Sequence, residues 1–340
     1  MPSLAVKVGK LEFSNPFLLA SGPLTRSEAT IRRAFKAGWG GVVTKTISLN
    51  PTISPKPSIA HLKELKSLVN IELISEVDAR TWMRWIKSLK RSFKKQMLIA
   101  SIMGGSKTVP WQTLGRMCEK AGADGLELNV SCPHGMPERG MGALLGQNPY
   151  LVKRITRAVK QVVDIPVWVK LTPNVTDIGL IARAAASAGA DGLVGINTVK
   201  ALGGIDIDTF TPRPSVSRLS AFGGYSGAAI KPIALRCVAE IVQAVDPSTD
   251  SGVSEAEPLP VSAVGGISDW RDAVEFMLLG ASTVQVCTAA LYRPDMISGL
   301  KTGLLKYLKR HRFNGVDSIV RRGLDKVLSH LDLTFDPLEI

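Results

Sequence analysis

The chain has 340 residues, of which 45% are apolar, and it carries a formal net charge of +13 at pH 7. This composition allows a large buried core, in two domains or in one α/β barrel. No stretch reaches the roughly 18 apolar residues of a membrane span, and the N-terminus lacks a secretory signal. The four cysteines, at positions 118, 132, 237 and 287, form no C-x-x-C pair. We therefore expect reduced thiols, a cytoplasmic location and no bound metal.

Short apolar segments alternate with amphipathic segments of helical length. The expected strands are residues 17–20, 41–45, 97–102, 125–129, 167–171, 192–197, 260–263 and 283–287. The expected helices are residues 28–37, 78–94, 113–121, 149–163, 177–188, 232–245, 270–279, 294–309 and 316–329. Strands that are apolar throughout are buried on both faces, as in parallel sheets. Eight strand–helix units predict an α/β fold, a (βα)8 TIM barrel over residues 1–310, with a helical extension over residues 311–340 packed on it.

One glycine-containing sequence motif recurs where a helix ends and a strand begins. It reads AGWGGVV from Ala37, AGADGLE from Ala121, AGADGLV from Ala188 and LGASTVQ from Leu279. Glycine supplies the left-handed residue that ends a helix. The repetition indicates a single supersecondary unit used many times and argues against a two-domain dinucleotide-binding enzyme. The polar stretch 246–258 is expected to be an insertion on the N-terminal face of the barrel.

Residues 126–148, LELNVSCPHGMPERGMGALLGQN, run from an apolar strand into a glycine-rich loop with Cys132 near its start. Such a loop beside a strand end is typical of a lid over a site. The Cys132 thiol is a candidate acid or nucleophile, and the alternative is a buried cysteine that only packs. His134 and Arg139 lie in the lid, residues 133–146, and are expected to be structural.

In a (βα)8 barrel the site forms at the C-terminal ends of the strands. The residues at these ends are Ser21, Lys45, Thr46, Asn129, Ser131, Cys132, Lys170, Asn197, Thr198, Gly265, Gly266, Cys287 and Thr288. So many polar groups at one mouth favour an anionic or hydrogen-bonding occupant, although the lysines can also be solvated at the rim. The pair Gly265 and Gly266, with Gly227 nearby, predicts a phosphate pocket. Lys170 could neutralise negative charge on a reduced flavin.

Basic residues are concentrated in residues 80–95 and 301–326. The first segment is an amphipathic helix, because Trp82, Trp85, Ile86, Leu89 and Phe93 share one face. That face is expected to pack on the barrel, and the alternative is docking to an acidic partner or an anionic surface. No nucleic-acid reader motif accompanies the charge, so we expect no nucleic-acid partner.

Several long motifs resemble one known family. They are NIELIS from Asn70, NVSCPHGM from Asn129, ERGMG from Glu138, KLTPNVTDI from Lys170 and GGYSGAAIKPIAL from Gly223. They resemble the FMN-binding domain of dihydropyrimidine dehydrogenase, which belongs with the dihydroorotate dehydrogenases, over roughly residues 5–308. The resemblance implies FMN held by Ser21, Lys45, Thr46, Lys170, Gly227, Gly265, Gly266, Cys287 and Thr288. It implies a pyrimidine ring held by Asn70, Asn129, Ser131, Asn197 and Thr198, with Cys132 as the catalytic cysteine.

The resemblance implies interconversion of uracil or thymine with its 5,6-dihydro form. The alternatives are a dihydroorotate dehydrogenase, an enzyme that acts on another unsaturated cyclic amide, and a barrel that serves only as an interaction scaffold. The chain has no cysteines for the iron–sulfur modules that feed electrons to dihydropyrimidine dehydrogenases. A separate electron-transfer protein or subunit is therefore expected, or a soluble acceptor such as fumarate. The +13 charge suits an acidic carrier, and a homodimer is expected.

Overall fold

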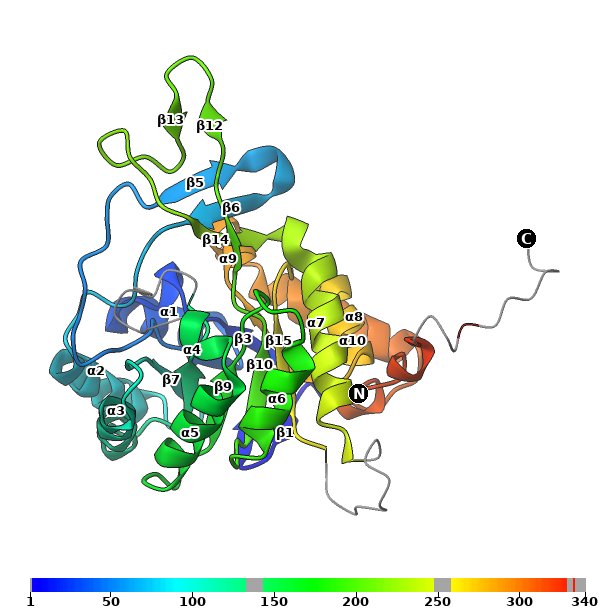
Figure 1. Cartoon of the computed structure of the whole chain (residues 1–340). Coiled ribbons are helices and arrows are strands. Elements are labelled where there is room, and N and C mark those ends of the chain that lie inside the picture. The colour runs from blue at the N-terminus through cyan, green and yellow to red at the C-terminus, as the bar shows by residue number, and fades with distance from the viewer. Residues whose placement is uncertain (1, 133–142, 248–257, 329–332, 334–340) are drawn as a thin grey trace.

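The computed structural model describes residues 2–132, 143–247, 258–328 and 333 (Figure 1). At its centre eight parallel strands close into a barrel in the order β10-β15-β16-β3-β4-β7-β8-β9. They are β3 (Phe17–Leu19), β4 (Gly41–Val43), β7 (Met97–Ile102), β8 (Gly125–Asn129), β9 (Val167–Lys170), β10 (Gly192–Gly195), β15 (Val261–Val264) and β16 (Ala281–Val286). Each overlaps a strand expected from the sequence. The predicted (βα)8 barrel is confirmed.

Helices surround the barrel (Figure 1). They are α1 (Glu28–Ala37), α2 (Ala79–Ser92), α3 (Thr108–Ala121), α5 (Pro149–Lys160), α6 (Ile178–Ala186), α7 (Lys231–Ala244), α8 (Trp270–Leu278) and α10 (Ile297–Arg310), with the short α4 (Ala143–Gly146) and α9 (Thr288–Tyr292). Helix α3 begins five residues before the predicted start, because Pro110 is compatible with a first helical turn. The Trp82 face of α2 is buried as expected.

The glycines of the recurrent sequence motif end their helices, as the sequence indicates. Gly38, Gly122, Gly189 and Gly280 have φ values of 96°, 97°, 86° and 108°. Gly38 and Gly122 also donate their backbone N–H groups to the last turns of α1 and α3. This left-handed conformation strains any residue with a Cβ atom, so glycine at these positions turns the chain from the outer helix back into the barrel.

The N-terminal end of the barrel is closed by a hairpin of β1 (Val6–Val8) and β2 (Leu11–Phe13), which the sequence did not reveal. Phe13 is 2% exposed, and its ring centroid lies 6.1 Å from that of Trp168 in β9. Leu11 is also buried. The hairpin seals this end with apolar side chains, so polar groups are left to collect at the other end.

A four-stranded antiparallel sheet covers part of the C-terminal end. Its order is β11 (Val199–Ala201), β14 (Gly223–Gly227), β6 (Ser67–Asn70) and β5 (Ile59–Leu62). We call this sheet the roof. Between β11 and β14 the chain projects outward as a ribbon of β12 (Ile205–Asp206) and β13 (Thr211–Pro212), at the top of Figure 1.

The helix predicted over residues 316–329 is wrong for residues 316–328, where the chain forms two 3-10 turns, Val316–Ser318 and Leu324–Lys326. Arg321 has φ 72°, which no right-handed helix accommodates. The Arg321 and Gly323 N–H groups donate instead to the carbonyls of Met277 and Leu278 at the end of α8, at 3.0 and 2.9 Å. These barrel carbonyls replace helical acceptors. The domain boundary at residue 310 stays a prediction.

Candidate functional site

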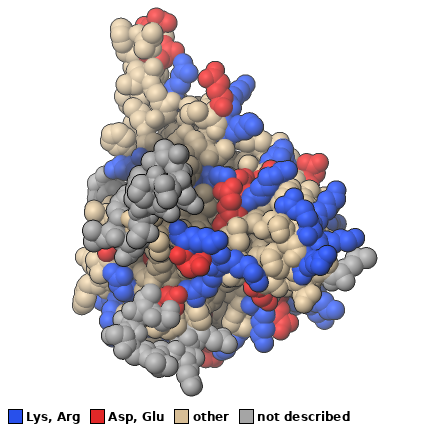
Figure 2. All heavy atoms as spheres, turned by 90° about the vertical axis from the view of Figure 1, so that its right-hand side faces the viewer, with Lys and Arg blue, Asp and Glu red and all other residues tan. Residues whose placement is uncertain are grey.

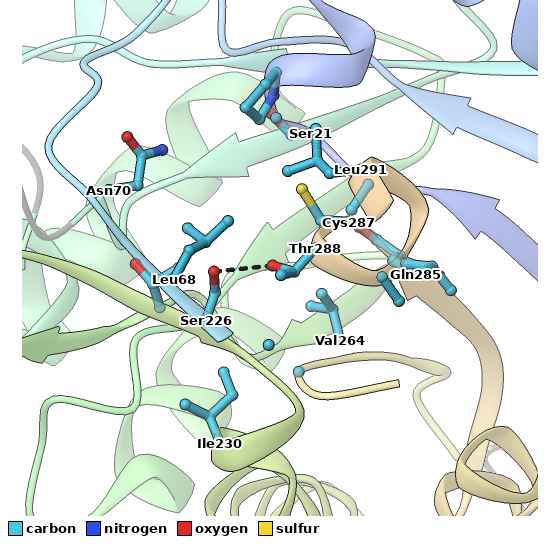
Figure 3. Close-up of a pocket in the computed structure, with 18 of the residues that line it drawn as sticks. Ser21, Leu68, Asn70, Ser226, Ile230, Val264, Gln285, Cys287, Thr288 and Leu291 are labelled. Carbon is cyan, nitrogen blue, oxygen red and sulfur yellow. Dashed lines mark hydrogen bonds between the residues drawn. The ribbon is translucent and has the colours of Figure 1, made fainter. Parts of the chain in front are cut away.

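A cavity of about 750 Å³ opens at the C-terminal ends of the barrel strands, beneath the roof (Figure 3). Fourteen of the fifteen predicted site residues line it: Ser21, Lys45, Thr46, Asn70, Asn129, Cys132, Lys170, Asn197, Thr198, Gly227, Gly265, Gly266, Cys287 and Thr288. The barrel supplies its floor, and β6 and β14 supply Asn70 and Gly227 from above. The structure therefore brings together residues spread over most of the sequence.

Ser131 is the predicted residue that lies outside the lining. It is fully buried, and its hydroxyl donates to the Asn129 side-chain oxygen at 3.3 Å. The Asn197 amide donates to Ser131 Oγ at 2.9 Å and to Asn129 Oδ1 at 3.2 Å. Asn129 in turn donates to Thr46 Oγ1 at 2.9 Å. Ser131 thus fixes the orientation of two asparagines that reach the cavity.

One wall of the cavity carries an ion pair that the sequence did not reveal. Lys45 follows β4, is 8% exposed, and its Nζ donates to Glu72 Oε2 at 2.7 Å. Glu72 follows the roof strand β6, and its N–H donates to Asn70 Oδ1 at 2.6 Å. The pair therefore joins the barrel floor to the roof beside Asn70.

The floor contains a second buried charge pair. Glu127 in β8 is fully buried, 3.5 Å from Lys170 Nζ, and accepts from Gln285 Nε2 at 3.2 Å. A carboxylate inside a barrel is costly unless it is paired, and the Lys170 ammonium and the Gln285 amide supply that pairing. The sequence did show one sign of it: Glu127 interrupts an otherwise apolar strand, LELNV.

The loop after β15 forms another part of the wall. Gly265 and Gly266 have φ values of 138° and 78°, which favour glycine. The Asp272 carboxylate accepts from the N–H groups of Ser268 and Asp269 at 2.7 and 2.9 Å. It also accepts from Lys231 Nζ at 2.8 Å. Asp272, which is 9% exposed, therefore holds this loop in place from behind.

Burial and these contacts act in opposite directions on the Asp272–Lys231 pair. Burial by itself raises the pKa of Asp272, but the hydrogen bonds from Lys231 and Ser268 prevail and lower it below the ordinary value. Burial by itself lowers the pKa of Lys231, and the hydrogen bonds to Asp272 and Glu275 prevail and raise it. Both groups are therefore held in their charged forms.

The outer end of the cavity lies between the roof and α9. Ser226 of β14 and Thr288 of α9 share a hydrogen bond of 2.9 Å, drawn in Figure 3. The lining there also includes Lys63, Lys66 and Arg293. Among the described lining residues, five basic side chains face two acidic ones, Glu72 and Asp269. The balance favours an anionic occupant.

The four cysteines differ in their surroundings. Burial raises the pKa of Cys118 to about 12 and that of Cys237 to about 11, and both side chains are buried within helices. Burial also raises the pKa of Cys287, against the opposing charges of Lys170 and Lys45. Cys132 is 8% exposed and lines the cavity.

The donor set fits a flavin mononucleotide. Gln285 Oε1 and Thr198 Oγ1 are buried without a hydrogen-bond partner in the described part of the chain, and both residues line the cavity. A flavin ring carries N–H and C=O groups. The two oxygen atoms can accept a hydrogen bond from its N–H group, and Lys45 and Lys170 can donate to its C=O groups. Its phosphate suits the basic outer end, with Ser226, Thr288 and the Gly265–Gly266 backbone.

Some expectations lie outside the described residues: lid residues 133–142, with His134 and Arg139, and most of the insertion 246–258. Within residues 2–132, 143–247 and 258–328, no three His, Cys, Asp or Glu side chains are grouped so as to hold a metal ion. No helix in this same part is long and apolar enough to cross a membrane.

Comparison with known proteins gives a consistent picture. Residues 3–308 match the sequence model described as dihydroorotate dehydrogenase. The chain is 37% identical to the chloroplastic dihydropyrimidine dehydrogenase (NADP(+)) of Arabidopsis thaliana, over 98% of this chain and 79% of that protein. It is 37% identical to the NAD-dependent dihydropyrimidine dehydrogenase subunit PreA of Escherichia coli (strain K12), over 97% and 79%. It is 38% identical to the catalytic subunit of dihydroorotate dehydrogenase B (NAD(+)) of Pyrococcus abyssi, over 93% and 98%.

Proposed function

Because the chain belongs to the dihydroorotate dehydrogenase family of oxidoreductases, we propose that it binds FMN and interconverts uracil or thymine with the 5,6-dihydro form. The observation that carries the proposal is the cavity itself, where cations, asparagines and Cys132 meet. Relatives named for dihydropyrimidine dehydrogenase support the substrate class. The motif SCPHGMPERGMG, which resembles that branch, favours it over dihydroorotate.

The proposed cofactor residues are Ser21, Lys45, Thr46, Lys170, Gly227, Gly265, Gly266, Cys287 and Thr288. When bound, FMN supplies the two-electron centre that exchanges a hydride with carbon 6 of the pyrimidine ring. Lys170, paired with Glu127 at 3.5 Å, lies on the floor where a cation can offset negative charge on the ring system. Cys287 contributes through its backbone.

The asparagines hold the pyrimidine ring by hydrogen bonds in this proposal. The ring presents N–H and C=O groups side by side, and an asparagine amide carries both an acceptor and donors. Asn70 reaches the cavity from the roof, and Asn129 and Asn197 reach it from the floor. Thr198 lies beside them, and Ser131 sets the orientation of Asn129 and Asn197. The network fixes the ring so that carbon 5 can face Cys132.

Cys132 is the proposed acid and base. Its thiol delivers a proton to carbon 5 when the ring is reduced, and its thiolate removes that proton when the ring is oxidised. Cys118 and Cys237 do not line the cavity, and burial keeps both as thiols. Neither can therefore take this role.

Dihydroorotate is the second candidate substrate, because relatives named for dihydroorotate dehydrogenase match the chain with similar identity. Its carboxylate would also be compatible with the basic lining. Another unsaturated cyclic amide is the third candidate.

FMN binding tests the cofactor proposal. We expect the purified chain to quench FMN fluorescence with one site per chain. Lys170→Met should raise the FMN dissociation constant about tenfold, through loss of one charge-assisted contact. Lys160→Met is the control, because Lys160 pairs with Asp191 on the outside of the barrel at 2.6 Å and should leave binding unchanged. FMN fluorescence that the wild-type chain does not quench would refute the proposal.

We also propose that electrons are exchanged with a separate protein or subunit in the cytoplasm. The support is the subunit named in two relatives, PreA and the catalytic subunit of dihydroorotate dehydrogenase B. Figure 2 shows Lys and Arg side chains over the face that carries α8 and α10, and Lys306, Lys309 and Arg310 of α10 are exposed. Turnover with an acidic carrier should fall steeply as salt rises. Equal turnover with NAD(P)H alone, unaffected by salt, would contradict this.

A further inference from the structure

Glu127 is a buried charged residue of the barrel that does not itself reach the cavity. It lies in β8, is 0% exposed and does not line the cavity. Both of its carboxylate oxygens contact residues that do line it. Oε1 lies 3.5 Å from Lys170 Nζ, and Oε2 accepts from Gln285 Nε2 at 3.2 Å. Any influence of Glu127 on an occupant of the cavity therefore passes through Lys170 and Gln285.

The first contact decides how much positive charge the floor presents. Lys170 ends β9, and its side chain is 6% exposed, so salt screens its ammonium group only weakly. Burial raises the pKa of Cys287, and the charge of Lys170 opposes that rise. The charge therefore acts on another residue of the cavity lining. With the Glu127 carboxylate beside it, however, Lys170 forms a pair without net charge.

The second contact fixes the direction of an amide group. A glutamine amide has a donating and an accepting end, and a carboxylate only accepts, so the NH2 group of Gln285 is turned toward Glu127. Gln285 Oε1 is buried and has no hydrogen-bond partner in the described part of the chain. This free acceptor suits the N–H group of a flavin ring. Glu127 thus holds a donor, Lys170, and an acceptor, Gln285, in fixed orientations.

The pair contributes less to the stability of the fold than its burial would suggest. Removal of two charges from water is costly, and the cost is repaid only where the geometry of the pair is excellent. Strong charged hydrogen bonds measure about 2.7–2.9 Å, whereas Lys170 and Glu127 are 3.5 Å apart. The position of the pair beneath the cavity therefore accounts for it better than its contribution to stability does.

We propose that Glu127 sets the reduction potential of the bound flavin, as a positioning residue that acts through Lys170. The inference rests on the proposed function, because it requires FMN in this cavity. A reduced flavin ring carries more negative charge than an oxidised one, so a cation beside it favours the reduced form and raises the potential. Glu127 cancels most of that effect. The flavin therefore remains reducing enough to pass a hydride to a pyrimidine ring as well as to accept one.

The reduction potential of the chain reconstituted with FMN tests the proposal, by equilibration with a reference dye. Glu127→Gln keeps the shape of the side chain and removes the charge that compensates Lys170. The ratio of the dissociation constants of oxidised and reduced FMN should rise about tenfold, which raises the potential of a two-electron couple by about 30 mV. Glu240→Gln is the matched control, because Glu240 pairs with Arg236 on the outside of α7 at 2.8 Å and its replacement should leave the potential unchanged.

A double variant keeps the test decisive if Glu127→Gln does not fold. Glu127→Gln with Lys170→Met removes both charges and so avoids the unpaired buried charge that makes single replacements costly. Its ratio of dissociation constants should stay within about threefold of the wild-type ratio, because neutral side chains replace a neutral pair.

Two results would overturn the proposal. One is a potential of folded Glu127→Gln equal to that of the wild type. The other is a ratio of dissociation constants that falls tenfold or more in the double variant, as the loss of an isolated cation would cause. A wild-type chain that binds no FMN would refute the proposed function and this inference together, so the two kinds of failure are distinguishable.

Discussion

At the scale of the residue, the site depends on pairs that keep charge inside an apolar barrel. Lys45 is paired with Glu72, and Lys170 with Glu127. The sequence revealed the two lysines, because they stand at strand ends, but it gave only one sign of a carboxylate, Glu127 within an apolar strand, and none of Glu72. Glu72 comes from the roof, and its approach to Lys45 across 27 positions is set by the tertiary fold alone.

Ser131 is a second residue whose contacts the sequence did not reveal. A hydroxyl next to Cys132 at a strand end predicts a contact with the substrate, yet both residues lie beyond β8, where the alternation of a strand no longer sets the direction of a side chain. Cys132 lines the cavity, and Ser131 faces inward and bonds to Asn129 and Asn197. Hydrogen bonds that come together only in the tertiary fold therefore decide which of these two neighbouring residues faces the cavity.

Replacement of Cys132 tests the proposed proton transfer. Cys132→Ala should bind FMN like the wild type and lose turnover by about 10²–10⁴-fold, the contribution of a positioned acid or base. Cys118→Ala is the control, because the Cys118 thiol is buried in α3 with its pKa raised to about 12 and should keep full turnover. Steady-state kinetics with the two variants gives the answer. Full activity of Cys132→Ala would move the role to another residue.

At the scale of the element, the barrel was predictable because each strand–helix unit has its own local signal. The apolar strands, the amphipathic helices and the glycine that ends a helix all lie within about 30 residues of one another. The roof has no such signal, since β6 pairs with β14 across more than 150 residues, Ser67 with Gly227. The wrong prediction over residues 316–328 has a related cause. The periodicity there is helical, but the end of α8 offers competing carbonyls.

The loop after β15 is an element whose shape depends on one carboxylate. Asp272→Ala removes the acceptor of the Ser268 and Asp269 N–H groups and the partner of Lys231. We expect unfolding by urea to show a loss of about 1–3 kcal/mol and FMN to bind more weakly. Glu275→Ala is the control, since Glu275 is 44% exposed beside the same lysine and should cost less than about 0.5 kcal/mol.

The pH dependence of this element follows from the directions of the two pKa shifts. Asp272 has a lowered pKa in the folded chain, so its contribution is present above its unfolded pKa near 4 and is lost as pH falls below that. Lys231 has a raised pKa, so its contribution is present below its unfolded pKa and is lost only as the pH rises past the folded one. The difference between wild type and Asp272→Ala should therefore shrink toward pH 3. A difference that stays constant down to pH 3 would contradict the assignment.

At the scale of the whole molecule, the two ends of the barrel differ in character. The hairpin of β1 and β2 closes one end of the barrel, and the cavity opens at the other beneath the roof. Lys and Arg side chains gather on the flank that carries α8 and α10, and the ribbon of β12 and β13 projects above the roof. Net charge alone predicted attraction to a partner, but only the structure shows on which face Lys and Arg side chains gather.

Anaerobic reduction of the bound flavin tests the proposed chemistry most directly. The chain reconstituted with FMN is mixed with dihydrouracil or with dihydroorotate, and flavin absorbance is followed with time. Dihydrouracil should bleach the flavin faster than dihydroorotate, and it should do so without any partner protein, because hydride and proton transfer require only the cavity and Cys132. No change in flavin absorbance with either compound, or faster bleaching by dihydroorotate than by dihydrouracil, would contradict the proposed function.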